Sequence, residues 1–108
     1  MLVEMFELQQ KLQEVADPRA KDLMNDEYIK DMILAAYSEL SEILNEINWK
    51  PWRQTKKTVY SGRYKNEIID LFHFVINLSI AVDMEPKEFF NRFVDKNKEN
   101  HERQKRGY

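Results

Sequence analysis

The scarcity of turn-forming residues is the strongest constraint on the fold of this chain. Its 108 residues include only two glycines and three prolines. A fold with many strands needs many tight turns, and tight turns depend on these two residue types. Apolar residues instead recur every three or four positions over long segments, which is the spacing of one face of an α-helix. The sequence therefore predicts an all-α protein.

Four helical segments can be delimited from this periodicity and from local stop and start signals. Asp17 precedes Pro18 and should end the first helix, because the residue before a proline avoids helical backbone. Asn25 or Asp26 can cap the second helix, and Pro86 suits the first turn of the fourth. The expected helices span about residues 2–15, 26–48, 63–82 and 86–106, with a loop over 49–62.

A chain of this length is predicted to form one domain, residues 1–108. Its core is thin for a monomer, because a small chain buries a modest fraction of its surface. The four helices also carry more apolar surface than one small core can cover. We therefore expect an antiparallel four-helix bundle module that is completed by homodimerisation, with a dimer of dimers as an alternative.

Composition excludes several classes of function. The net charge of −2 disfavours binding to a nucleic-acid polymer. No apolar run approaches the roughly 18–20 residues that a membrane span needs, so we expect no membrane contact. The chain has no cysteine, which removes disulfides and Cys-type zinc sites. A cytoplasmic protein is predicted.

Carboxylates border the apolar face of the second and third helices. Glu39, Glu42 and Glu46 fall within an arc of roughly 60° beside the apolar face of the second helix. Glu67 and Asp70 repeat this arrangement on the third helix. If the two apolar faces pack together, four or five carboxylates converge between the helices.

Such a cluster needs an explanation, because unpaired carboxylates repel one another and lose their hydration when buried. The ordinary alternative is a solvated helix face paired with lysines. No lysine or arginine occurs between Lys30 and Lys50, so the second helix lacks those partners. A divalent cation would resolve the repulsion, and oxygen ligands without histidine or cysteine favour Mg²⁺ or Mn²⁺.

The end of the chain is basic. Lys96, Asn100 and Arg103 share one helical face, and together they offer a point charge, a neutral donor and a forked donor. These groups suit phosphate oxygens. Two alternatives are a solvated basic tail and, less favoured, an RNA-binding tail, since the phenylalanines upstream have the pattern of core residues.

Four motifs along the chain, in the order in which they occur, resemble those of the all-α nucleoside triphosphate pyrophosphohydrolases. The resemblance is strongest to the dimeric dUTPase / dCTP pyrophosphatase branch, alongside MazG-type enzymes. The segment 6–12, FELQQKL, looks like the opening helix of that branch. The other motifs are ELSEILNEINWKPW at 39–52, NEIIDLFHF at 66–74 and KNKENHERQKRGY at 96–108.

The resemblance implies an enzyme that uses Mg²⁺, or Mn²⁺, to hydrolyse a deoxynucleoside triphosphate. The expected substrate is dUTP, and the expected products are the monophosphate and pyrophosphate. One alternative is a MazG-like pyrophosphohydrolase acting on dCTP or on a non-canonical nucleoside triphosphate. Another, from a different class, is a non-catalytic helical-bundle interaction protein.

The resemblance also implies roles for particular residues. The implied metal ligands, of which Glu39 and Glu42 are also catalytic, are Glu39, Glu42, Glu67 and Asp70. The implied phosphate-binding residues are Lys96, Asn100, Arg103 and Tyr108. The residues implied to contact the base or sugar are Gln9, Trp49, Lys50, Trp52, Phe74 and Asn77. For Phe74, packing in the core is an equal alternative.

The chain departs from the branch in its length. About twenty-five residues separate Asp70 from Lys96, where dimeric dUTPases commonly carry extra helices. The chain is therefore a minimal version, closer in size to MazG-type modules. Base contacts that such an insert would supply are not expected here.

Overall fold

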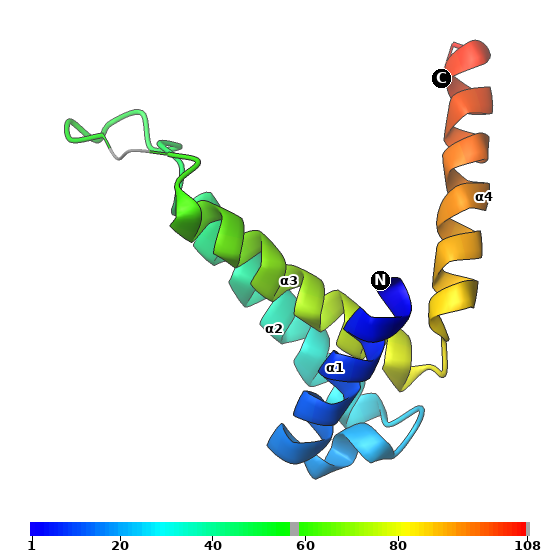
Figure 1. Ribbon diagram of the computed structural model, residues 1–108. Coiled ribbons are helices and arrows are strands. Elements are labelled where there is room, and N and C mark those ends of the chain that lie inside the picture. The colour runs from blue at the N-terminus through cyan, green and yellow to red at the C-terminus, as the bar shows by residue number, and fades with distance from the viewer. Residues whose placement is uncertain (57–58, 108) are drawn as a thin grey trace.

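The computed structural model describes residues 1–56 and 59–107, which form four α-helices and one short 3₁₀ helix (Figure 1). No strand occurs within these ranges, so the predicted all-α class is confirmed. No helix in the described ranges has both the length and the apolar character that crossing a membrane requires. The elements are α1 Leu2–Ala16, η1 Pro18–Lys21, α2 Asp26–Leu44, α3 Gly62–Ala81 and α4 Pro86–Lys105.

The helix boundaries follow the local signals in the sequence. Asp17 leaves helical geometry with φ −145°, and its side chain accepts a hydrogen bond from the Arg19 N–H at 3.0 Å. Asn25 caps α2 by accepting a hydrogen bond from the Tyr28 N–H at 3.0 Å. Pro86 is the first residue of α4, as predicted.

The prediction that the second helix continues to about Asn48 is wrong, because α2 ends at Leu44. The N–H groups of Glu46 and Ile47 bond to carbonyls three residues back, at 3.0 and 3.2 Å. This tighter winding ends the α-helix. Glu46 therefore lies in the turn after α2 and does not continue the carboxylate stripe.

Helices α2 and α3 lie side by side and run antiparallel (Figure 1). Tyr28, Met32 and Ala81 are buried together between them. The same register brings the C-terminal half of α2 against the N-terminal half of α3. The two carboxylate-bearing segments are therefore neighbours.

Helix α1 packs across the C-terminal half of α3. Phe6 and Gln9 are the buried residues of α1. The Gln9 side-chain amide donates a hydrogen bond of 2.8 Å to the side-chain carbonyl of Asn77 on α3. This contact joins α1 to α3 through a buried polar pair.

Helix α4 leaves the other helices after its first turns (Figure 1). Phe89 meets Phe6 edge to face, with ring centroids 5.6 Å apart. Beyond that contact α4 does not pack along α2 or α3. The radius of gyration is 17.1 Å, whereas a compact domain of this length has about 13 Å. One chain alone therefore does not close the expected four-helix bundle.

The single chain leaves much apolar surface uncovered. Its accessible surface is 8345 Å², whereas a compact monomer of this mass exposes about 6,400 Å². The exposed apolar side chains of α1 and α2 include Met5, Leu8, Leu12, Val15, Leu34, Tyr37 and Leu40. Apolar surface of this extent is typical of proteins that associate.

Candidate functional site

Carboxylates from α2 and α3 meet in one cluster. One oxygen from each of Glu39, Glu67 and Asp70 can be chosen so that all three lie within 4.8 Å of one another. Glu39 comes from α2, and the other two lie one turn apart on α3. The structure thus brings together three of the four residues implied as metal ligands.

Two oxygens of this cluster are buried without a donor. Glu39 Oε2 and Glu67 Oε2 have no hydrogen-bond partner among the described residues. Two carboxylates cannot hydrogen-bond to each other unless one of them is protonated. No described lysine or arginine forms an ion pair with Glu39, Glu67 or Asp70. The cluster is therefore short of positive charge.

With no positively charged partner among the described residues, carboxyl groups in the cluster have raised pKa values. The pKa of Glu39 is raised to about 7, chiefly by burial and then by the neighbouring Glu67, Glu42 and Asp70 carboxylates. The pKa of Glu67 is also raised, mainly by contact with the Glu42 carboxyl and then by burial. Protonation of Glu39 would relieve the same repulsion between carboxylates that a bound cation would relieve.

Glu42 lies at the exposed edge of the cluster. It is one turn after Glu39 on α2, its side chain contacts Glu67, and it is open to solvent. All four implied ligands therefore lie in one region of the structure.

The cluster fits a hard divalent cation. Its donors are carboxylate oxygens, and neither histidine nor cysteine contributes to it. Oxygen donors of this kind are the ones that Mg²⁺ and Mn²⁺ prefer. A cation would also neutralise the two buried oxygens that lack donors.

Glu46 has another partner. Its carboxylate lies 3.5 Å from the guanidinium Nε of Arg63, in the first turn of α3, and its side chain is 16% exposed. The expectation that Glu46 extends the carboxylate stripe is therefore wrong, because α2 ends before it and an arginine neutralises it.

Gln9 and Asn77 contact each other, but both side chains are buried within this chain. They are 6% and 2% exposed and hydrogen-bond to each other, and the Asn77 amide also approaches Met32 Sδ at 3.6 Å. Both polar side chains are thus engaged in joining α1, α2 and α3. Their implied role at the base or sugar stays a prediction.

Phe74 is partly buried against the core cluster of Tyr28, Met32 and Ala81. It lies on the face of α3 that carries Asp70, one turn further along. Its packing accounts for its position without a substrate. The implied contact with the deoxyribose stays a prediction.

The loop after α2 forms a second polar region. Trp49 and Trp52 meet edge to face at 6.0 Å, and Lys50 Nζ lies 5.3 Å from the Trp49 ring centroid. Beside them, Lys50, Arg53 and Lys56 line a hollow of about 310 Å³. Arg53 and Lys56 escaped the sequence analysis, although basic residues three apart in a tryptophan-containing loop are a usable signal for an anion-binding surface.

The basic residues of α4 are held as a group. Glu99 pairs with Lys96 at 2.9 Å and with Arg103 at 2.6 Å, one turn to either side. Asn100 is exposed on the same helix. Tyr108, also implied in phosphate binding, lies outside the described residues. These groups lie on the diverging arm of α4 and not beside the carboxylate cluster of their own chain (Figure 1).

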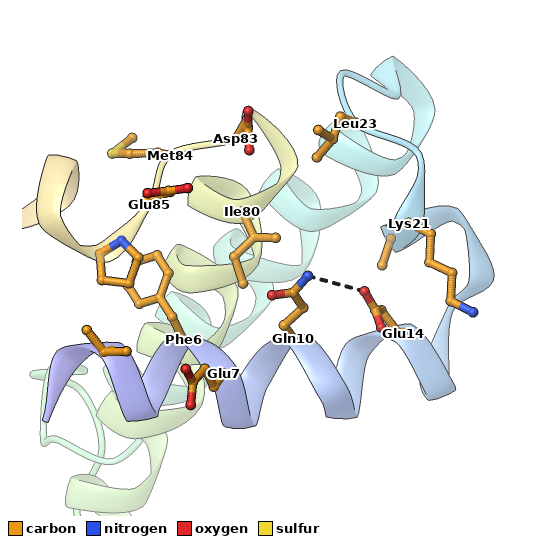
Figure 2. A pocket seen from close by; sticks show the side chains of 13 residues that line it. Phe6, Glu7, Gln10, Glu14, Lys21, Leu23, Ile80, Asp83, Met84 and Glu85 are labelled. Atoms are coloured by element: carbon orange, nitrogen blue, oxygen red, sulfur yellow. Dashed lines mark hydrogen bonds between the residues drawn. The ribbon is translucent and has the colours of Figure 1, made fainter.

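A further hollow, of about 460 Å³, lies between α1 and the turn after α3 (Figure 2). Phe6 and Ile80 form part of its apolar lining, and Glu7 and Glu85 contribute negative charge. None of the implied site residues lines it. Its acidic rim is unsuited to a triphosphate, so we do not assign the substrate to it.

Comparison with known proteins adds independent information. A sequence model of the dUTPase family matches residues 1–93, a stretch that contains the carboxylate cluster and ends before Lys96. The dCTP pyrophosphatase of Enterobacteria phage LZ5 is 33% identical over 99 residues, which cover 77% of this chain and 58% of that protein. The dCTP pyrophosphatase of Enterobacteria phage T4 is 32% identical over 101 residues, covering 82% of this chain and 58% of that protein.

A DNA replication protein of phage T4 is 29% identical over 91 residues, which cover 72% of this chain and 23% of that protein. The chain spans just over half the length of the two dCTP pyrophosphatases that it matches. No solved structure matches it.

Proposed function

The chain belongs to the all-α dUTPase family, and on that premise we propose that it hydrolyses a deoxynucleoside triphosphate to the monophosphate and pyrophosphate. The observation that carries the proposal is the cluster of Glu39, Glu67 and Asp70 between α2 and α3. Its oxygens are gathered, partly buried and without a cationic partner among the described residues.

We assign Glu39, Glu42, Glu67 and Asp70 as the residues that hold Mg²⁺. The ion, when bound, supplies positive charge for the triphosphate and makes a water molecule more acidic. The support is the all-oxygen donor set and the raised pKa of Glu39 and Glu67, whose charged forms are costly until a cation is present.

We assign Glu42 as the group that orients the attacking water and accepts its proton. It is exposed at the solvent edge of the cluster and contacts Glu67. Attack at the α-phosphorus breaks the bond between the α- and β-phosphates, and pyrophosphate leaves. Lys96, Asn100 and Arg103 would hold the phosphates, with Tyr108 as a further candidate.

The names of the two phage relatives change the base that we propose for the substrate. The sequence motifs imply dUTP, with dCTP as an alternative, whereas the two phage relatives are named dCTP pyrophosphatases. We therefore propose dCTP as the first substrate to test. Trp49, Lys50 and Trp52 are the proposed stacking and edge contacts to the base, with Phe74, Asn77 and Gln9 toward the sugar and base.

We propose that the protein functions as a homodimer. The single chain exposes about 2,000 Å² more surface than a compact monomer of its mass would. That excess is of the size that a stable interface buries. Sedimentation equilibrium should give about twice the chain mass of 13.1 kDa, and a monomeric mass at all concentrations would contradict the proposal.

Release of pyrophosphate from a panel of nucleotides tests the proposed reaction. We expect Mg²⁺-dependent turnover of dCTP or dUTP, with the monophosphate as the other product, and none after chelation with EDTA. Glu67→Gln and Asp70→Asn should abolish turnover while the circular dichroism spectrum is kept. Glu27→Gln, in the exposed first turn of α2, is the matched control and should be active. Absence of turnover on the whole panel, with no effect of Mg²⁺ on melting, would favour a non-catalytic helical protein.

A further inference from the structure

We propose that the hollow between α1 and the turn after α3 binds an aliphatic polyammonium ion, that is, a linear polyamine. The site lies outside the carboxylate cluster and is separate from the proposed hydrolysis. The hollow has a volume of about 460 Å³ (Figure 2), which is within the range of cavities that hold small molecules. Its lining combines apolar surface with negative charge, and this combination determines which ligand fits.

The floor of the hollow is apolar. The Phe6 ring from α1 is 4% exposed, and Ile80 from α3 is half-buried opposite it (Figure 2). Ala20 and Leu23, which precede α2, and Met84 extend this apolar lining. An inorganic cation gains nothing from such a surface, whereas methylene groups bury apolar area against it.

Carboxylates lie on two walls of the hollow. Glu7 and Glu14 come from α1, and Asp83 and Glu85 come from the turn that leads into α4 (Figure 2). None of these four carboxylates forms an ion pair with a described lysine or arginine. Lys21 is the single basic residue among those that line the hollow. The hollow therefore carries an excess of negative charge that a cation would complement.

The spacing of the carboxylates favours a long cation with more than one charge. Glu7 and Glu14 are seven residues apart, so about 10 Å separates them along the helix axis. One ammonium group cannot contact both, whereas the amines of a polyamine are separated by chains of methylene groups. The methylene groups can lie over Phe6 and Ile80 while the amines meet the carboxylates, as the long side chain of a lysine does on a protein surface.

The proposed dimer leaves this hollow accessible. The α1 residues that line it are Val3, Phe6, Glu7, Gln10 and Glu14. The exposed apolar stripe of α1, from Met5 to Val15, is centred roughly 160° away around the helix, since each residue turns the helix by about 100°. A second copy that packs on this stripe meets the other side of α1.

A ligand in the hollow would hold the start of α4 against α1. One wall of the hollow is α1, and the other, at Asp83 and Glu85, continues directly into Pro86, the first residue of α4. A polyamine that contacts both walls binds the folded chain and not the unfolded one. It should therefore raise the melting temperature as its concentration increases.

Calorimetric titration of the protein in EDTA tests the proposal. The probes are spermidine and a series of linear diamines of increasing length. We expect saturable binding of one spermidine per chain, and an affinity for diamines that rises by up to about fourfold for each methylene group that becomes buried. Absence of saturable binding, or one affinity for all the diamines, would overturn the proposal, because bare charge attraction does not depend on the apolar floor.

Matched variants locate the bound polyamine. The double variant Glu7→Gln, Glu14→Gln should bind spermidine about tenfold more weakly, the loss expected for two partly exposed ion pairs. Glu4→Gln changes an exposed acid of α1 that does not line the hollow, and it should bind as the wild type does.

Glu67→Gln separates this site from the carboxylate cluster. It should keep the wild-type affinity for spermidine. If binding is lost in Glu67→Gln and kept in the Glu7, Glu14 double variant, the polyamine binds the carboxylate cluster and the assignment to the hollow is wrong. None of these measurements needs turnover, so they decide the polyamine site whether or not the chain hydrolyses a nucleotide.

Discussion

Glu39 is the residue in which stability and function are most clearly opposed. Its carboxylate is partly buried beside three other carboxylates, and its pKa is raised to about 7, chiefly by burial. An apolar or amide side chain would pack there at lower cost. The presence of an acid at this position is explained if a cation is its working partner.

Replacement of Glu39 by glutamine should therefore stabilise the metal-free protein. The amide is neutral and can donate a hydrogen bond to the Glu67 carboxylate. We expect the melting temperature at pH 8, in EDTA, to rise by about 4–8 °C, the shift that 1 kcal/mol produces in a domain of this size. The increase that Mg²⁺ causes in the wild type should be lost. A variant that melts lower than the wild type in EDTA would show that the acid is structural.

The raised pKa of Glu39 also predicts how the stability of the folded chain depends on pH. The pKa of Glu39 is about 7 in the folded chain, above its ordinary value of 4.5, so the folded state binds the proton more tightly. Its contribution to stability is complete below about pH 4.5 and is lost as the pH rises through about 7. Urea unfolding in EDTA should therefore show the wild type losing stability across this range relative to Glu39→Gln. Parallel curves for the two proteins would refute the assignment.

The buried pair of Gln9 and Asn77 calls for a separate test. Asn77→Ala leaves the Gln9 amide without its 2.8 Å acceptor, and a buried unpaired polar group costs about 1–3 kcal/mol. We expect urea unfolding to show a loss of this size. A variant of unchanged stability but altered base preference would mean that the pair serves the substrate alone.

At the scale of the helices, the sequence determines where each helix begins and ends more fully than it determines how the helices are arranged. Asp17, Asn25 and Pro86 mark boundaries that the structure has, because caps and prolines act within a few residues. The convergence of the carboxylates was also predictable, since both helices carry them beside the face that packs.

Three features of the site could not be predicted from the sequence. The early end of α2 depends on a local tightening over Glu46 and Ile47, and the partner of Glu46 is an arginine seventeen residues away. The direction of α4 depends on the fit of Phe89, in the first turn of α4, against Phe6 on α1. Periodicity carries no information about contacts so far apart in sequence.

The caps of α2 and α3 offer a matched pair of substitutions. Asn25 accepts a hydrogen bond from the Tyr28 N–H, whereas Ser61, at the same position of α3, makes no side-chain cap bond. Asn25→Ala should cost about 1 kcal/mol of unfolding free energy, and Ser61→Ala much less. Equal losses in chemical denaturation would contradict the capping geometry.

At the scale of the whole molecule, the single chain does not form a closed, compact bundle. It is extended, with a radius of gyration of 17.1 Å, and its apolar helix faces are exposed. Its basic helix points away from its acidic cluster (Figure 1). A second copy would cover the apolar faces, which is why we propose the dimer as the working unit.

The proposed function depends on α2 and α3 presenting their carboxylates to one cation. Titration with Mn²⁺, followed by its electron paramagnetic resonance signal, measures this directly. We predict binding by the wild type, weakening of at least about tenfold in Glu67→Gln, and unchanged affinity in Glu27→Gln. Equal affinity in all three proteins, or none in the wild type, would show that these acids do not form a metal site.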